Sequence, residues 1–238
     1  MIFHTAAEKK YYNAFFKLWH RNILKHVPAA KFSLKFVGNT EDTDVIEFCR
    51  TNNIDLTLDP TTWEELLEKH KTEFKASGYY PMARWNSIPV TNEHVCVTDV
   101  DVIMLKNEID SIKELLETRD YIALQRGKKC TLMVNFINKK SCSAVRNLAI
   151  NLMDSPNFQW DLDVTVANWM ESNLTNNLFL NKLTKFDSAF DRTAFLKDDE
   201  AFFGYYSSVS FTKNGTTYAG GFEAKNAKYK IAQRRGLI

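Results

Sequence analysis

The chain has 238 residues, of which 45% are hydrophobic and 25% are charged, and its formal net charge is +2. This is the composition of a globular protein, and the length allows one substantial α/β domain or two small ones. The small net charge gives no reason to expect nucleic acid as the main partner, and no segment approaches the roughly 20 apolar residues that a membrane span requires.

The first half of the chain alternates strand-like and helix-like segments. The predicted strands are 2–6, 32–37, 54–58 and the apolar run that begins at residue 95. The predicted helices are 8–26, a short one around 45–49, one from a capping box at Thr62 and Glu65 toward residue 76, and 82–88. This alternation predicts an α/β fold with a mostly parallel central sheet, right-handed crossovers and helices on both faces.

The second half is less regular. Its predicted helices are 109–116, 141–152 with Ser141 as the N-cap, and 164–180, and its predicted strands are 121–124, 130–137 and 201–211. The end of the chain is basic, with Lys225, Lys228, Lys230, Arg234 and Arg235. No repeat, low-complexity segment or linker interrupts the chain, so we expect a single domain over residues 1–238.

Two further features bear on the cellular compartment. The four cysteines are scattered along the chain and three lie in apolar surroundings, so we expect free buried thiols rather than disulfides or a metal cluster. The chain begins with a strand-like segment instead of a basic and apolar leader, so we expect no signal peptide. Together these features predict a cytoplasmic protein without a transmembrane segment.

The strongest candidate site is the pair of acids that ends the apolar run from Val95. Side chains alternate along a strand, so Asp99 and Asp101 are expected on the same side, about 7 Å apart. Unpaired carboxylates are costly to bury, so the two acids would lie at a wet edge of the sheet or hold a cation. Ligands of open α/β sheets bind at the carboxyl ends of the strands, so we expect a metal and a phosphate-bearing ligand here. The alternative is that the strand stops at Asp99 and both acids are solvated loop residues, because Asp-x-Asp is a short pattern with many chance matches.

Four segments of the chain together resemble one group of enzymes. They are Arg84 ahead of the Asp-x-Asp at 97–103, Ile137-Asn138-Lys139-Lys140 leading into a helix, Trp160-Asp161-Leu162-Asp163 before another helix, and Tyr218-Ala219-Gly220-Gly221-Phe222-Glu223-Ala224-Lys225. This layout resembles the nucleotide-sugar-dependent glycosyltransferases of the GT-A fold, and most of all the retaining group that includes glycogenin. Three features depart from that group. No histidine follows His94 to complete its metal site, Thr131-Leu132-Met133 replaces the Asn-x-Gly before its Ile-Asn, and Leu162 stands where a glutamine is usual.

The resemblance implies a fold and an activity. The fold is a single Rossmann-like GT-A domain in which residues 1–105 bind the nucleotide sugar and residues 106–238 bind the acceptor. The activity is metal-dependent transfer of a hexose from a UDP or GDP sugar to a glycan or glycoprotein acceptor, with retention. Asp101 would bind Mn²⁺ or Mg²⁺ directly, and Asp99 would hold the ribose or share the metal, since both cations prefer oxygen ligands and keep open positions for phosphate.

The resemblance also assigns roles to other side chains. The diphosphate would be contacted by Arg84 and Lys225. The nucleoside would be bordered by Thr5 and Ala6, and the catalytic candidates facing the sugar or the acceptor are Asp163 and Asp161.

Each of these residues also has an ordinary structural interpretation. Arg84 can be a surface arginine lying over Trp85 or pairing with a nearby acid. Asp161 and Asp163 flank a helix start, where an acid commonly serves as N-cap. Lys225 can belong to a solvated basic tail. His4, in the first strand, is expected to be a packed and hydrogen-bonded histidine rather than a ligand or a base.

Two other functions compete with sugar transfer. The first is a phosphatase of the haloacid dehalogenase type, in which Asp-x-Asp supplies a nucleophile and a general acid above Mg²⁺, and for which 197–199 would be the distal acidic pair. That class usually carries its Asp-x-Asp on the first strand, whereas here about three strand–helix units precede it. The second is a non-catalytic module that binds a nucleotide sugar or a glycan, an option that the missing histidine keeps open.

Overall fold

The structure is a computed structural model that describes residues 1–126, 129–154, 162–186, 201–213, 215–236 and 238. Its centre is a seven-stranded sheet in the order β3-β2-β1-β4-β7-β6-β8. These strands are β1 (Ile2–Glu8), β2 (Lys31–Val37), β3 (Ile54–Asp59), β4 (Val95–Thr98), β6 (Tyr121–Arg126), β7 (Lys129–Ile137) and β8 (Asn177–Leu180). β7 runs antiparallel to both of its neighbours and the other pairs are parallel, which confirms the mostly parallel sheet.

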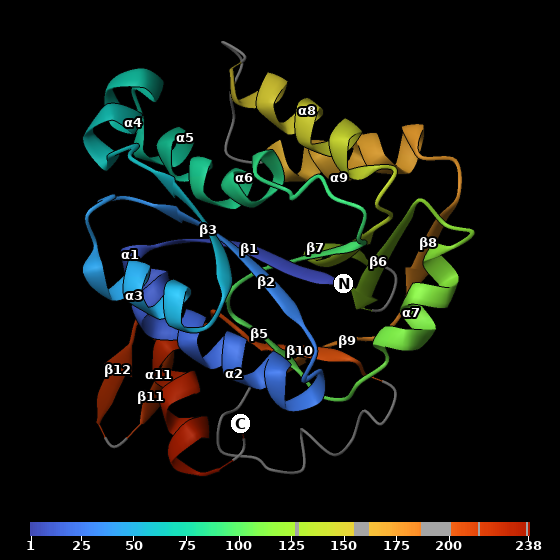
Figure 1. Cartoon of the computed structure of the whole chain (residues 1–238). Coiled ribbons are helices and arrows are strands. Elements are labelled where there is room, and N and C mark those ends of the chain that lie inside the picture. Colours follow the sequence, from blue (N-terminus) through green and yellow to red (C-terminus); the bar gives the residue numbers. More distant parts are fainter. Residues whose placement is uncertain (127–128, 155–161, 187–200, 214, 237) are drawn as a thin grey trace.

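Helices cover both faces of this sheet (Figure 1). One face carries α1 (Lys9–Tyr11), the π-helical turn η1 (Tyr12–Phe16), α2 (Lys17–His26) and α3 (Thr43–Thr51). The other face carries α4 (Trp63–His70), α5 (Glu73–Ser77), α6 (Tyr79–Asn86), α8 (Cys142–Met153) and α9 (Leu162–Asn173). Each face has its own apolar core. In β4, Cys96 packs into one core while Val95 and Val97 pack into the other, as expected for a strand buried on both sides.

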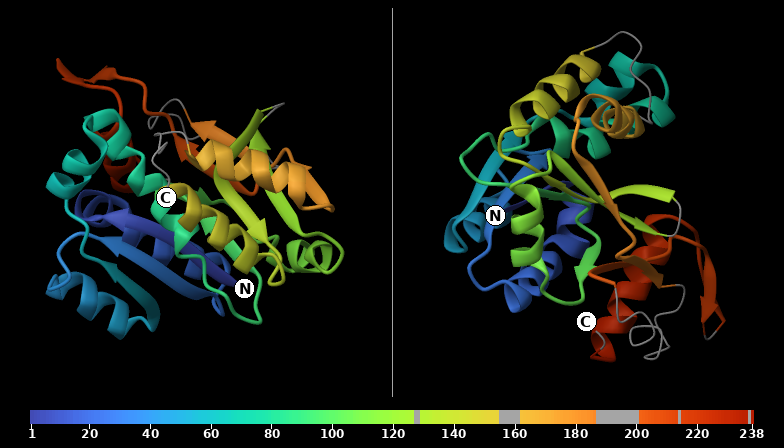
Figure 2. Two further views of the ribbon diagram at one scale, coloured as in Figure 1. Left: turned by 90° about the horizontal axis from the view of Figure 1, so that it is seen from above. Right: turned by 90° about the vertical axis from the view of Figure 1, so that its right-hand side faces the viewer.

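A second, smaller sheet lies beneath the first, in the order β5-β10-β9. Its strands are β5 (Val102–Met104), β9 (Leu183–Phe186) and β10 (Phe203–Tyr206). The remaining described elements are α7 (Ile109–Leu116), the hairpin of β11 (Phe211–Lys213) with β12 (Thr216–Tyr218), and α11 (Phe222–Arg234). The hairpin projects from the body of the fold in both views of Figure 2. The apolar run from Val95 thus forms two strands in two different sheets, β4 and β5.

Several predicted boundaries are wrong. The helix predicted over 164–180 ends at Asn173, because the Asn177 side chain donates to the carbonyls of Met170 and Glu171 and the apolar residues that follow join the sheet as β8. The strand predicted over 201–211 covers only Phe203–Tyr206, and Phe211 begins a separate strand, β11.

Helix starts were predicted with mixed success. The capping box is confirmed, since Glu65 N–H donates to Thr62 Oγ1 at 3.2 Å and Thr62 N–H donates to Glu65 Oε2 at 2.8 Å. Ser141 lies before α8 but makes no capping bond through its side chain. α6 begins three residues earlier than predicted, with Pro81 inside its first turn, where a missing N–H costs nothing.

Two expectations about the whole chain can be compared with the described residues. Cys49, Cys96 and Cys142 are free thiols in buried positions, as predicted. None of the helices described is long and apolar enough to cross a membrane.

Candidate functional site

A cavity of about 550 Å³ opens at the carboxyl ends of β1 and β4. Its walls come from the β1–α1 junction, from helices α4 to α6, from the turn between β4 and β5, and from α11. Five of the eight predicted site residues line it: Ala6, Arg84, Asp99, Asp101 and Lys225. The sheet therefore brings together side chains that are far apart in the sequence, at the edge where a ligand was expected.

The two acids lie in a turn. β4 ends at Thr98 and β5 begins at Val102, so the strand alternation from which we inferred that the acids face the same side does not apply. Both acids nevertheless line the cavity. The alternative is therefore right that the strand stops at Asp99. It is wrong that both acids are solvated, because Asp101 is only 3% exposed and the Asp99 carboxylate pairs with Arg84.

Buried hydrogen bonds hold this turn from its β4 side. Thr5 Oγ1 donates to the Thr98 carbonyl at 2.9 Å, and the Trp19 indole N–H donates to Thr98 Oγ1 at 3.0 Å. Asp99 N–H donates to the Met133 carbonyl at 2.9 Å. Thr5 is fully buried and does not line the cavity, so the expectation that it borders a nucleoside is not supported: its hydroxyl fixes the end of β4.

A further contact fixes the turn from its β5 side. The Asn22 side chain accepts from Met104 N–H at 2.7 Å and donates to the Met104 carbonyl at 3.1 Å. A primary amide can make both bonds because it carries a donor and an acceptor side by side. Asn22 thereby ties α2 to β5.

Each acid forms an ion pair with a basic residue that also lines the cavity. Arg84 Nη1 donates to Asp99 Oδ1, and Lys225 Nζ donates to Asp101 Oδ2. Arg84 is 7% exposed, with its guanidinium carbon 5.6 Å from the centre of the Trp85 ring, so it is not a surface arginine, although it does pair with an acid and lie over Trp85. The two acids and two bases balance in charge.

Lys225 is held in its charged form although it is nearly buried. Burial acts to lower the pKa of Lys225, but the neighbouring Asp101 carboxylate outweighs burial and raises that pKa above its ordinary value. Tyr229, one turn further along α11, donates its hydroxyl proton to the Asp101 carbonyl. Two residues of α11 therefore hold Asp101, one by its side chain and one by its main chain, and Lys225 is not part of a solvated tail.

The acids fit a cation that takes its remaining ligands from a bound phosphate. Among the residues described, no group of three or more His, Cys, Asp or Glu side chains is arranged to hold a metal ion. Mg²⁺, however, is commonly bound through one or two carboxylates together with substrate phosphates. Asp99 and Asp101 supply such carboxylates, and each would share its oxygens with the base that it already contacts.

The remaining predicted residues are placed as follows. Asp161 lies outside the described residues, as do residues 197–199. Asp163 is the second residue of α9, a helix that packs beside α6 and α8. His4 is buried and hydrogen-bonded, as expected for a packed histidine.

Sequence reasoning missed other residues of the cavity wall. Glu8 is the last residue of β1 and Tyr11 is the last residue of α1, and burial raises the pKa of both side chains. Trp63 and Tyr80 stack across the opposite side, with ring centroids 6.3 Å apart and planes 13° apart. The place of Glu8 at the carboxyl end of the first strand was a usable signal, whereas nothing in the sequence links Trp63 to Tyr80.

Comparison of the fold with solved structures finds glycosyltransferases. The galactosyltransferase LgtC, solved in complex with donor and acceptor sugar analogs, aligns over 100% of both chains with a TM-score of 0.57 and 14% identity. TarS from S. aureus in complex with UDP aligns with 87% of this chain and 60% of its own, with a TM-score of 0.56 and 10% identity. GlyE from Streptococcus pneumoniae aligns with 97% of this chain and 59% of its own, with a TM-score of 0.52 and 14% identity. The chain therefore spans about three fifths of the length of TarS and GlyE.

At the level of sequence, no protein-family model and no curated protein matches the chain. The structural likeness, at 10–14% identity, concerns the fold. The chain is therefore a single α/β domain with the GT-A fold of these glycosyltransferases, as predicted.

Proposed function

We propose that this chain is a glycosyltransferase that moves a hexose from a nucleoside-diphosphate sugar to a glycan or glycoprotein acceptor. The observation that carries the proposal is the meeting of Arg84, Asp99, Asp101 and Lys225 in one cavity at the carboxyl end of the central strand. LgtC was solved with donor and acceptor sugar analogs and TarS with UDP, which supports a UDP sugar as the first donor to test, followed by a GDP sugar.

The two bases are the groups that would bind the diphosphate. Both are cationic, both line the cavity, and both are held in place by an acid. When the bond between the anomeric carbon and the diphosphate breaks, negative charge builds on the leaving phosphate. Arg84 and Lys225, which line the cavity, would stabilise that charge by charge-assisted hydrogen bonds.

The two acids are the groups that would hold a divalent cation. Asp101 and Asp99 would bind Mn²⁺ or Mg²⁺ as the diphosphate arrives and supplies the other oxygens. A bound cation would add Lewis-acid stabilisation of the leaving diphosphate. Ala6 lies at the end of β1, on the side of the cavity where the nucleoside would sit.

The acceptor side is assigned to the second half of the chain. Asp163, the second residue of α9, and Asp161 are the candidates to face the sugar or the acceptor. Retention at the anomeric carbon is proposed from the resemblance to retaining enzymes. Residues 1–105 would then serve the donor and residues 106–238 the acceptor.

A ligand screen tests this function. The intact chain is screened by thermal shift against UDP, GDP and their sugar conjugates, with and without Mn²⁺, and positives are assayed for slow release of free sugar. We expect stabilisation by a nucleoside diphosphate, because binding to the folded state alone raises the melting temperature, together with slow hydrolysis of the matching donor.

Two outcomes point to the competing functions. Binding without any donor hydrolysis or transfer would identify a non-catalytic nucleotide-sugar or glycan-binding module. Hydrolysis of a generic phosphomonoester with Mg²⁺, abolished by Asp99→Asn, would identify a phosphatase.

A further inference from the structure

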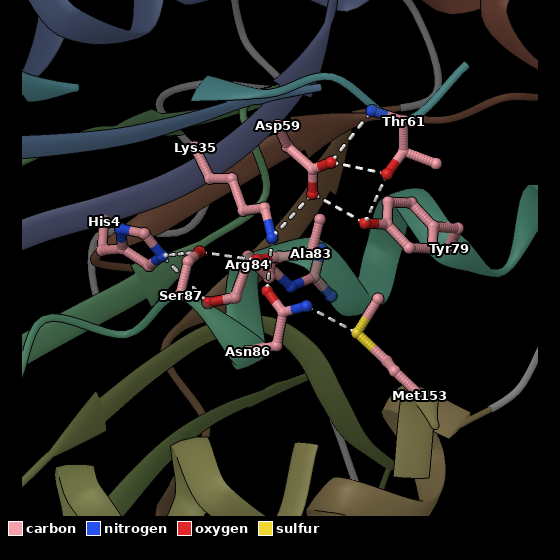
Figure 3. A network of polar contacts seen from close by, with 10 residues as sticks. All are labelled: His4, Lys35, Asp59, Thr61, Tyr79, Ala83, Arg84, Asn86, Ser87 and Met153. Atoms are coloured by element: carbon pink, nitrogen blue, oxygen red, sulfur yellow. Dashed lines mark hydrogen bonds and ion pairs between the residues drawn. The ribbon is translucent and has the colours of Figure 1, made fainter. Parts of the chain in front are cut away.

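Helix α6 rests on buried polar residues from three adjacent parallel strands. His4 of β1, Lys35 of β2 and Asp59 of β3 lie on the side of the helix that faces the sheet (Figure 3). Each is no more than 8% exposed. Burying charged groups is costly unless they are paired and hydrogen-bonded. The polar partners of these three residues therefore show which parts of the chain they hold together.

Asp59 holds the first residue of α6. Its Oδ2 accepts from the Tyr79 hydroxyl at 2.6 Å and from Lys35 Nζ at 2.8 Å, while its Oδ1 accepts from the Thr61 hydroxyl at 2.6 Å. Burial acts to raise the pKa of Asp59, but the bonds from Lys35, Thr61 and Tyr79 outweigh burial and lower the pKa to about 2. Asp59 therefore remains a charged acceptor for Tyr79 at any physiological pH.

Lys35 holds the last residue of the same helix. Its Nζ donates to the Asn86 side-chain oxygen at 2.9 Å, in addition to the ion pair with Asp59. One buried ion pair thus contacts both ends of α6, at Tyr79 and at Asn86 (Figure 3).

His4 holds the main chain at Arg84 itself. Its Nε2 lies 2.9 Å from the Arg84 carbonyl, which can only accept, so Nε2 carries the proton. Its Nδ1 then accepts from Ser33 Oγ, 3.1 Å away. Burial lowers the pKa of His4 to about 3, which keeps the ring neutral with this proton arrangement.

A buried ion pair contributes little net stability, because the desolvation cost approaches the electrostatic gain. Its effect here is geometric. Between the two held ends, α6 turns Tyr80, Pro81 and Arg84 toward the cavity, and Arg84 meets Asp99 there.

We propose that Lys35, Asp59 and His4 are positioning residues that fix helix α6 so that Arg84 stays directed at the diphosphate position. None of the three lines the cavity, so each acts through α6. The diphosphate part of this inference rests on the proposed function, whereas the fixing of α6 does not.

The test is a matched pair of single variants. Tyr79→Phe removes the hydroxyl that Asp59 holds and keeps the ring. Tyr121→Phe removes a hydroxyl that donates to Asn135 at 2.7 Å between strands β6 and β7, and is the control. Both changes remove a hydroxyl with a short hydrogen bond, so urea unfolding of each variant shows how much of any effect is general destabilisation.

Two readouts are compared in the intact 238-residue chain. Hydrogen–deuterium exchange over residues 79–87 should increase in Tyr79→Phe and not in Tyr121→Phe. The affinity for the nucleoside diphosphate that wild type binds best should fall about 5- to 10-fold in Tyr79→Phe alone, within the range expected for the loss of one ordinary hydrogen bond.

The outcomes separate the two claims. Equal hydrogen–deuterium exchange over residues 79–87 in both variants would overturn the inference that the buried polar residues fix helix α6. Increased exchange with unchanged nucleotide affinity would overturn the positioning role. Failure of wild type to bind any nucleoside diphosphate would refute the proposed function instead, and the exchange result would then decide the fixing of α6 by itself.

Discussion

At the scale of single residues, the site consists of two acid–base pairs that the fold holds from several directions. Asp101 is held through its carboxylate by Lys225 and through its carbonyl by Tyr229. Asp99 is held through its carboxylate by Arg84. Such support matters, because groups that bind a charged ligand are most effective when their positions are set before the ligand arrives.

The buried His4 should make stability depend on pH. Its pKa is about 3 in the folded state, below the ordinary 6.5, so the unfolded chain binds more protons between these values and stability falls as the pH is lowered through 6.5. The loss is at most about 1.4 kcal/mol per pH unit. Between pH 7 and pH 5 the free energy of unfolding, measured with urea, should therefore fall by about 2 kcal/mol more in wild type than in His4→Gln. An equal loss in both proteins would contradict a buried neutral His4.

At the scale of elements, the sequence predicted the first four strands and the helices between them, because their apolar residues recur at regular spacing. It failed where a tertiary contact decides the structure. Residues 177–180 are apolar enough to continue a helix, and only the open edge of β6 and the Asn177 side chain make them a strand. Whether the strand stops at Asp99 stayed open for a similar reason, since β5 pairs with β10, about 100 residues later in the chain.

Strand β10 depends on a glycine. A Cβ added to Gly204 would lie 2.4 Å from the ring of Phe186 on β9, well inside van der Waals contact. Gly204→Ala should therefore destabilise the protein by about 1–3 kcal/mol, the usual cost of overpacking. Because β10 also pairs with β5, the destabilisation would extend to β5, the strand that follows the turn containing Asp99 and Asp101.

A double variant checks the cause of that loss. Adding Phe186→Leu to Gly204→Ala removes the ring that the new methyl group would meet, so the two effects on the urea unfolding free energy should not be additive. Strictly additive effects would show that the predicted clash does not occur.

At the scale of the whole molecule, the cavity is assembled from four parts of the chain that only the fold brings together. The Asp-x-Asp pattern, Arg84 and Lys225 could be found from the sequence because each belongs to a local motif. Trp63 and Tyr80 could not, since their stacking depends on how α4 and α6 pack. Thr5 was assigned to the nucleoside because it is near the carboxyl end of β1, but strand alternation turns it into the core.

In the proposed function, Asp101 and the turn around it bind a cation that in turn binds a diphosphate. The most direct measurement is isothermal titration of the best nucleoside diphosphate with and without Mn²⁺, in wild type, in Asp101→Ala, and in Asp110→Ala as a control whose side chain is 86% exposed on α7. We predict that Mn²⁺ increases nucleotide affinity at least about tenfold, or 1.4 kcal/mol, in wild type and in the control. In Asp101→Ala the gain from Mn²⁺ should disappear while the fold is retained. The same gain from Mn²⁺ in Asp101→Ala as in wild type, or no gain in any of the three proteins, would contradict the claim.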